Sequence, residues 1–244
     1  MNILTFDIET APAEAYAWQM WKTNIAPTQI IAPGYTLSWA AKWLGEPAKK
    51  TVYRSVWDKG DFISELHDLL NEADAVVGYN SDKFDLRHMN REFTQIGLGP
   101  VRPLASIDLY KIVKRNFNFP YYRLDYVSQK LLGAKKLDTG GFDLWPAFMK
   151  KDPKALKKMQ QYNIKDVLLT EKLYTYLLPW VKNHPFVGDG DIIIPDSDVT
   201  YECPACGSTD TQKERPRRTR CFGIRVVRCG NCGSWSEGQR KKLS

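Results

Sequence analysis

The amino-acid sequence predicts an α/β fold with a mixed sheet flanked by helices, followed by a small metal-binding module. Three strand-like segments come first, at residues 2–10, 35–45 and 50–57, and Gly and Pro separate the last two. Helical and strand-like segments then alternate through residues 60–178, which favours a mixed sheet with helices on its faces. Four of the five cysteines stand in two close pairs near the end of the sequence and indicate a separate module.

The later segments can be placed by their apolar periodicity. Residues 60–73 have apolar side chains at helical spacing and lead into a short apolar strand at 74–80. A long helix is predicted to begin at Pro153 and to run to residue 178. Asp152 is its expected N-cap, because aspartate favours the N-cap position and proline the first turn.

Charge is distributed unevenly along the 244 residues. Residues 201–244 contain ten Lys or Arg and four Asp or Glu, a formal charge of +6, whereas the first 200 residues carry +1. We predict a domain at 1–182, a linker rich in Gly, Pro and Asp at 183–200, and a basic module at 201–244. A small basic module beside a near-neutral domain points to an anionic polymer as its partner.

The sequence lacks the features of membrane and secreted proteins. No run of about 18 apolar residues occurs, so neither a transmembrane helix nor a membrane partner is expected. The first nine residues already include acidic side chains, and no basic segment precedes an apolar core. We therefore expect no secretory signal and a reducing, cytoplasmic compartment.

Two Cys-x-x-Cys-Gly turns predict a metal site in the C-terminal module. Cys203 and Cys206 form the first pair, and Cys229 and Cys232 form the second. Two such turns can aim four thiolates at one ion, for which zinc is the expected metal. Disulfides are the weaker alternative, because a cytosolic chain keeps its thiols reduced. Cys221 is expected to be a free thiol in a strand, and the module as a whole resembles a zinc ribbon.

Arginine-rich segments flank a strand-like segment between the two cysteine pairs. We expect Arg217, Arg218 and Arg220 to contact phosphate, because guanidinium groups bind phosphate through paired hydrogen bonds. Nucleic acid is the expected partner of these arginines. Docking of a replication or repair protein is the alternative use of the module.

Two carboxylates lie one residue apart in the first predicted strand. Asp7 and Glu9 occupy positions i and i+2, so their side chains share one face of the strand. Two negative charges this close need a cation between them unless one group keeps its proton.

Further polar side chains follow a later strand and stand on the long helix. Asn80, Phe84 and Asp85 come at the end of an apolar strand, at the carboxyl edge of the sheet, where sites tend to lie. Tyr162 and Asp166 occupy positions i and i+4 of the helix, one turn apart on the same face. The sequence thus predicts a cluster of four carboxylates and one phenol.

The segments FDIET, GYNSDKFD and YNIKD resemble, in their order and separation, the three exonuclease motifs of the DnaQ-like DEDD superfamily of 3′ to 5′ exonucleases. Tyr162 places the resemblance in the tyrosine subclass, DEDDy, and the likeness is closest to the proofreading exonuclease domains of B-family DNA polymerases. The resemblance covers residues 1–180. It implies an RNase H-like fold and metal-dependent hydrolysis of phosphodiester bonds.

Phosphodiester hydrolysis explains why the site consists of carboxylates. Two Mg²⁺ or Mn²⁺ ions can neutralise the phosphate, activate water and stabilise the leaving oxygen, and these hard cations prefer oxygen ligands. The resemblance implies that Asp7 bridges both ions. Glu9 and Asp166 would complete the ion that activates water, and Asp85 would hold the second ion through its waters.

The same resemblance relates other residues to the substrate. Tyr162 would orient the nucleophilic water, and Asn80 and Phe84 would position the terminal nucleotide. Single-stranded DNA is the favoured substrate, and RNA is the open alternative. Trp18 and Trp21, just after the first motif, could also line a groove for a single strand.

Two other functions are compatible with part of the sequence. A non-catalytic adaptor would use the RNase H-like body as a scaffold and the zinc ribbon to bind nucleic acid, although a scaffold does not need clustered carboxylates. A related metal-dependent endonuclease or ribonuclease would keep the metals and cleave differently. No polymerase motifs follow residue 180, so we expect a stand-alone exonuclease or a separate subunit.

Overall fold

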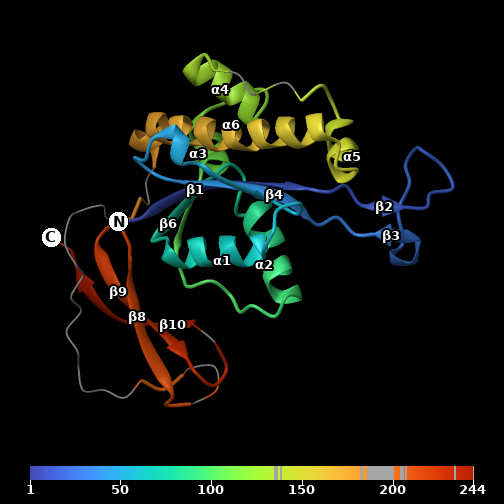
Figure 1. The fold of residues 1–244 in the computed structure, drawn as a ribbon. Coiled ribbons are helices and arrows are strands. Elements are labelled where there is room, and N and C mark those ends of the chain that lie inside the picture. The colour runs from blue at the N-terminus through green and yellow to red at the C-terminus, as the bar shows by residue number, and fades with distance from the viewer. Residues whose placement is uncertain are drawn as a thin grey trace.

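A five-stranded mixed sheet lies at the centre of this computed structural model (Figure 1). Its strands, in the order β5-β4-β1-β6-β7, are β1 (Ile3–Thr10), β4 (Thr36–Trp43), β5 (Val52–Ser55), β6 (Ala75–Gly78) and β7 (Ala105–Asp108). The first three in sequence, β1, β4 and β5, pair antiparallel, whereas β6 and β7 run parallel to β1. The predicted mixed sheet with an initial three-stranded meander is confirmed.

The structure describes residues 1–134, 137, 139–181, 184–185, 201–203, 206, 208–233 and 235–243. The predicted linker at 183–200 lies outside the described residues except for His184 and Pro185, so its boundaries stay a prediction. Among the helices of the described part, none has the length and apolar content needed to cross a membrane.

Helices cover both faces of the sheet and lie above and below the strands in Figure 1. One face is covered by α1 (Phe62–Glu72) and α2 (Asp85–Gln95), and the other by α3 (Leu109–Asn116), α4 (Leu124–Leu132) and α6 (Pro153–Leu177), with α5 (Leu144–Met149) against α6. Short 3₁₀ helices lie at Pro27–Gln29, Ala48–Lys50 and Leu178–Trp180. The long helix α6 begins at Pro153 as predicted, and Asp152 Oδ1 accepts a hydrogen bond of 2.8 Å from the backbone N–H of Ala155.

The alternation of side chains along β1 separates the core from the acidic residues. Leu4, Phe6 and Ile8 are buried among side chains of α1 and α2. Because neighbouring residues of a strand point to opposite faces, Asp7 and Glu9 point to the face that α6 crosses. The two acids therefore share one face of the sheet, as predicted.

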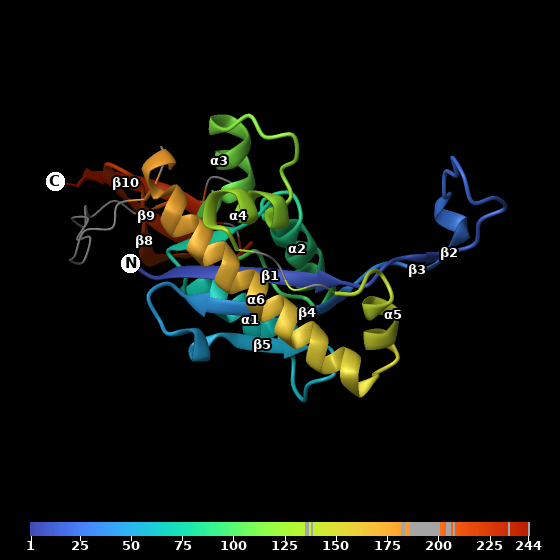
Figure 2. The same cartoon turned by 90° about the horizontal axis from the view of Figure 1, so that it is seen from above.

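A two-stranded arm interrupts the path from β1 to β4. In this arm β2 (Glu14–Ala15) pairs with β3 (Ile30–Ala32), and Figure 2 shows the connecting segment projecting away from the sheet. Trp18 and Trp21 lie on this segment and are 98% and 85% exposed. They do not belong to the groove that contains Asp7.

Asp108, at the end of β7, fixes the loop that follows β6. Asn80 in this loop has a φ of 65°, the left-handed region that few non-glycine residues adopt. Asp108 Oδ1 accepts hydrogen bonds from the backbone N–H groups of Asn80 (2.9 Å) and Tyr110 (3.0 Å), so one carboxylate fastens the loop and caps α3. Gly78 permits the turn, because a side chain there would collide with Ser81.

Three antiparallel strands form the C-terminal module, in the order β10-β9-β8. They are β8 (Thr211–Arg218), β9 (Phe222–Cys229) and β10 (Trp235–Lys242), and β9 is the strand that the sequence predicted between the cysteine pairs. Cys221 is an exposed free thiol, but it lies in the turn before β9 and not in a strand. The Thr219 N–H donates to the Phe222 carbonyl over 2.8 Å and closes this turn.

The C-terminal module contacts the amino edge of the parallel strands. Arg102, only 5% exposed, donates hydrogen bonds to the carbonyl oxygens of Ala73 (2.9 Å) and Arg215 (2.8 Å). Trp235 Nε1 donates to the Pro100 carbonyl oxygen over 3.1 Å. Because these body residues directly precede β6 and β7, the module lies opposite the edge at which the parallel strands end (Figure 1).

Replacement of Arg102 by alanine is expected to lower the free energy of unfolding by about 3 kcal/mol. The change removes the donor for two carbonyl groups and the 3.7 Å ion pair with Asp74. Urea denaturation measures the effect. Arg115→Ala, at an exposed arginine in the last turn of α3, is the control and should stay within about 0.5 kcal/mol of the wild type. Equal losses in both variants would contradict the role assigned to Arg102.

Burial raises the pKa of Asp108, which predicts a pH dependence of stability. A carboxyl group with a higher pKa in the folded chain binds its proton more tightly there. Its stabilising contribution is therefore present below the ordinary pKa of 3.8 and is lost as the pH rises through the raised value. As the pH rises, the free energy of unfolding of the wild type should fall relative to that of Asp108→Asn, when both are measured at a series of pH values. A constant difference would contradict this assignment.

Candidate active site

Three carboxylates from two elements converge on one face of the sheet. Asp7 and Glu9 extend from β1 and Asp166 from α6, and their nearest carboxylate oxygens all lie within 4.8 Å of one another. Asp166 is only 1% exposed. Three negative groups at this separation repel one another unless a cation or protons neutralise them. The structure thus brings together three of the four acids that the sequence predicted.

The donor atoms of this cluster fit a hard divalent cation. All three side chains offer carboxylate oxygen, the ligand that Mg²⁺ and Mn²⁺ prefer. The cluster contains no nitrogen or sulfur donor that would favour a softer metal. Asp7, Glu9 and Asp166 therefore suit the metals that the sequence predicted.

Asp85 lies beside the cluster and is not a member of it. It is the first residue of α2, is 4% exposed, and its Oδ1 accepts a hydrogen bond of 3.0 Å from the backbone N–H of Ile8. Since Ile8 stands between Asp7 and Glu9, this bond fastens α2 to the strand that carries both acids. Coordination of a second metal ion by Asp85 stays a prediction.

Two side chains that the sequence analysis missed orient the carboxylates. The fully buried Asn163 donates from Nδ2 to Asp7 Oδ2 over 2.7 Å. Trp145, on α5, donates from Nε1 to Glu9 Oε2 over 3.2 Å. The position of Asn163, three residues before Asp166 on the same helix, could have revealed it. No pattern in the sequence marks Trp145, because its contact depends on the tertiary placement of α5.

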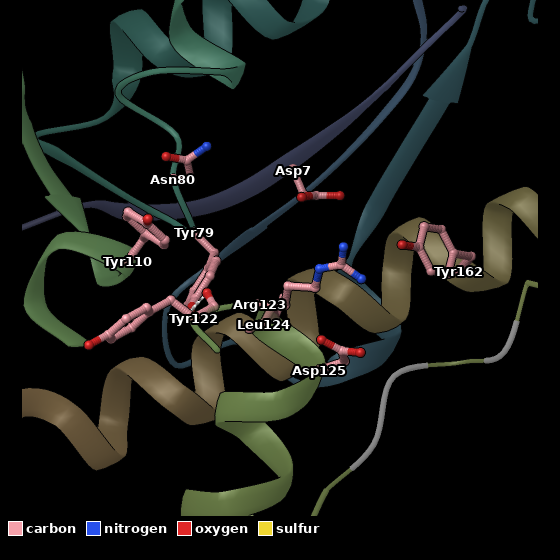
Figure 3. A pocket seen from close by; sticks show the side chains of 9 residues that line it. All are labelled: Asp7, Tyr79, Asn80, Tyr110, Tyr122, Arg123, Leu124, Asp125 and Tyr162. Atoms are coloured by element: carbon pink, nitrogen blue, oxygen red, sulfur yellow. Dashed lines mark hydrogen bonds between the residues drawn. The ribbon is translucent and has the colours of Figure 1, made fainter. Parts of the chain in front are cut away.

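A groove opens between Tyr162 and Asp7. It has a volume of about 500 Å³ and is lined by Asp7, Tyr79, Asn80, Tyr110, Tyr122, Arg123, Leu124, Asp125 and Tyr162 (Figure 3). The Tyr162 ring meets the Trp145 ring edge-on, with 6.1 Å between centroids. The predicted substrate residue Asn80 belongs to the lining. Phe84, also predicted, does not; it is 39% exposed and lies against His88.

The four paired cysteines cluster in the C-terminal module. The sulfur atoms of Cys203 and Cys232 are 3.7 Å apart, as are those of Cys206 and Cys229, and all four lie within 4.8 Å of one another. Zn–S bonds of about 2.3 Å in a tetrahedron place sulfur atoms about 3.8 Å apart. A disulfide would need about 2.05 Å. The spacing therefore fits a four-thiolate zinc site, as predicted for a zinc ribbon.

The predicted phosphate-binding arginines lie on the C-terminal module, away from the carboxylates. Arg217, near the end of β8, forms an ion pair of 2.6 Å with Glu237 of β10. Arg218 ends β8 and Arg220 lies in the following turn. The structure therefore does not bring these arginines together with the carboxylate cluster: the module that carries them contacts the amino edge of the parallel strands, whereas Asp7 and Glu9 lie in the second half of β1.

Sequence comparisons relate this chain to parts of longer proteins. It is 28% identical over 158 residues to a putative DNA polymerase 060R of Frog virus 3, and 22% identical over 203 residues to a DNA polymerase of Pyrococcus glycovorans. The alignments cover 49% and 73% of this chain, and 15% and 25% of the two relatives. The chain thus spans a quarter or less of the length of these relatives.

A solved structure shares the fold. The family B DNA polymerase from the hyperthermophilic archaeon Pyrobaculum calidifontis matches with a TM-score of 0.54 and 22% identity, over 73% of this chain and 24% of that chain. At this identity the likeness shows the fold alone. The predicted RNase H-like fold and the predicted similarity to B-family DNA polymerases are confirmed.

The family match covers the residues that build the site. A sequence model of the RNase H superfamily matches residues 4–178, which include the five-stranded sheet and the three clustered carboxylates. This stretch is more than two thirds of the chain. The chain therefore belongs to the RNase H superfamily.

Proposed function

We propose that this chain is a metal-dependent 3′ to 5′ exonuclease that hydrolyses phosphodiester bonds from the 3′ end of nucleic acid. The cluster of Asp7, Glu9 and Asp166 beside Tyr162, at an open groove, is the observation that carries the proposal. Membership of the RNase H superfamily supports nuclease chemistry. The resemblance of the three motifs to those of the DEDDy exonucleases supports the 3′ to 5′ direction of hydrolysis.

The protein's part in the reaction is to hold its acids and the reacting groups in place. Two Mg²⁺ or Mn²⁺ ions, bound by the four acidic site residues, would neutralise the phosphodiester, activate water and stabilise the leaving oxygen. Asn163 orients Asp7 and Trp145 orients Glu9, so both carboxylates keep fixed positions. Such prior orientation lowers the cost of reaching the transition state.

The remaining site residues act on the water and on the strand end. Tyr162 would hold the attacking water through its hydroxyl group, from a ring that is braced by Trp145. Asn80 would position the terminal nucleotide from within the groove, and the exposed Phe84 would do so from outside the groove lining. Single-stranded DNA is the proposed substrate, because the matched relatives are DNA polymerases and the groove is open; RNA is the alternative.

The zinc ribbon would add a second contact with nucleic acid. Its arginines, among them Arg218 and Arg220, belong to the module that contacts the amino edge of the sheet and would bind phosphates remote from the cleaved bond. Binding of a replication or repair protein at the same surface is the alternative.

Asp166→Ala should reduce hydrolysis by about a thousandfold or more, because the variant loses a buried ligand of the metal site. A 5′-labelled single-stranded DNA and the matching RNA, incubated with Mg²⁺ or Mn²⁺, should show ladders that shorten from the 3′ end and that EDTA abolishes. Asp68→Ala, at an exposed acid of α1, is the control and should retain wild-type activity.

A circular single-stranded DNA completes this test. The proposed exonuclease would spare the circle and degrade the linear form. Cleavage of the circle would identify an endonuclease. Binding of the linear strand without cleavage by the wild type in either metal would favour the non-catalytic adaptor. Full activity of Asp166→Ala would refute the metal assignment.

Cys232→Ser should lower the zinc content of the purified protein and destabilise the C-terminal module, because a small module draws much of its folding free energy from its metal. Mass spectrometry under native conditions measures the zinc, and thermal unfolding measures the stability. Cys221→Ser is the matched control, since its thiol lies outside the cluster, and should keep the wild-type zinc content. Equal zinc content in both variants would contradict a four-cysteine site.

A further inference from the structure

The groove beside the carboxylate cluster has two kinds of wall. Aromatic rings form one wall: Tyr79 and Tyr110 meet edge-on with 6.0 Å between centroids, and Tyr110 and Tyr122 with 6.2 Å. Figure 3 shows this aromatic wall facing the side of the groove that holds Asp7 and Tyr162. Flat apolar surface next to polar groups suits a nucleotide, whose sugar and base need contact area while its phosphate needs a cation.

Arg123 is the one positively charged residue among the nine that line the groove. In Figure 3 its guanidinium group lies in the space between Asp7, Asp125 and Tyr162. The side chain is exposed, and within the described part of the chain it donates no hydrogen bond and forms no ion pair. A guanidinium group that faces the groove and has no partner among the described residues is available to a bound anion.

The backbone on both sides of Arg123 is held firmly. The carbonyl oxygen of Tyr122 accepts a hydrogen bond of 2.6 Å from the Tyr79 hydroxyl, and that of Arg123 accepts one of 3.0 Å from the Val127 N–H in the first turn of α4. Leu124, the next residue, is buried in the core between α4 and α6. The flexible side chain therefore starts from a fixed point at the mouth of the groove.

We propose that Arg123 binds the phosphate of the substrate strand next to the bond that is hydrolysed, through two hydrogen bonds from its guanidinium group to the non-bridging oxygens. This inference rests on the proposed function and adds a substrate-binding residue to it. The acidic cluster repels a nucleic-acid strand, so a cation on the facing wall favours entry of the strand end. Arginine presents a planar fork that matches two phosphate oxygens, and lysine presents a single point charge.

Binding without hydrolysis tests the inference directly. Fluorescence anisotropy with a 5′-labelled oligothymidine in Ca²⁺ gives the Kd at a series of KCl concentrations. Arg123→Gln should raise the Kd by roughly tenfold and should reduce the slope of log K against log [KCl] by about 0.7, the value for one single-strand phosphate contact. Arg123→Lys should keep the slope and bind with intermediate affinity, because it retains the charge and loses the paired hydrogen bonds.

Lys130→Gln is the matched control. Lys130 lies on α4, the helix that Arg123 precedes as its N-cap residue, and its ammonium group sits over the Tyr126 ring at 5.6 Å and not in the groove. This variant removes the same charge and should leave the slope at the wild-type value. A loss of slope in Lys130→Gln equal to that in Arg123→Gln would show a general effect of charge and overturn the inference.

A neutral methylphosphonate at the last linkage of the oligothymidine locates the contact. Its effect on the Kd and that of Arg123→Gln should not add, because both remove the same interaction. Full additivity would overturn the assignment to this phosphate. Hydrolysis in Mg²⁺ distinguishes the two proposals. If the wild type is active and Arg123→Gln binds with unchanged Kd and slope, the role of Arg123 alone is overturned. If the wild type neither binds nor cleaves the strand, the proposed function is overturned.

Discussion

The mutual repulsion of Asp7, Glu9 and Asp166 is the constraint on which the rest of this structure depends. Folding brings three carboxylates within 4.8 Å of one another, one of them almost fully buried, and this arrangement is unfavourable without a cation. Rigid neighbours are needed to hold them. Two regular elements, β1 and α6, supply the acids. The buried Asn163 of α6 joins this helix to the sheet, because its amide group bonds to Asp7 of β1 and to Ser38 of β4.

The elements that could be predicted are those set by local chemistry. The alternation along β1, the Asp152 cap of α6 and the i, i+4 pair of Tyr162 and Asp166 are each encoded within a few residues, and each stands where the sequence placed it. The ordered motifs then pointed to four acids, three of which the structure brings together. The spacing of the two Cys-x-x-Cys pairs likewise predicted the cluster of four cysteines.

The contacts that escaped prediction join residues far apart in the sequence. Trp145 and Glu9 are separated by 136 positions, and nothing local to either residue encodes their hydrogen bond. Arg123 is similar: its sequence neighbourhood reads as an ordinary helix start, and only the folded chain places it opposite Asp7. Cys221 shows that local sequence can also mislead. Its neighbours are typical of a strand, but Cys221 itself lies in the turn just before β9.

The opposed placement of the zinc ribbon and the carboxylates has a consequence for the length of the substrate. The ribbon contacts the amino edge of the parallel strands, while the acids stand toward the far end of β1, which is 8 residues long. Asp7 and Glu9 lie four and six residues after Ile3, the first residue of β1, which at about 3.3 Å per residue is roughly 13–20 Å of sheet. A stacked strand advances about 3.4 Å per nucleotide, so about four to six nucleotides are needed to span that distance. Under the proposed function, strands longer than this would contact both the zinc ribbon and the carboxylates, whereas shorter strands would contact the carboxylates alone.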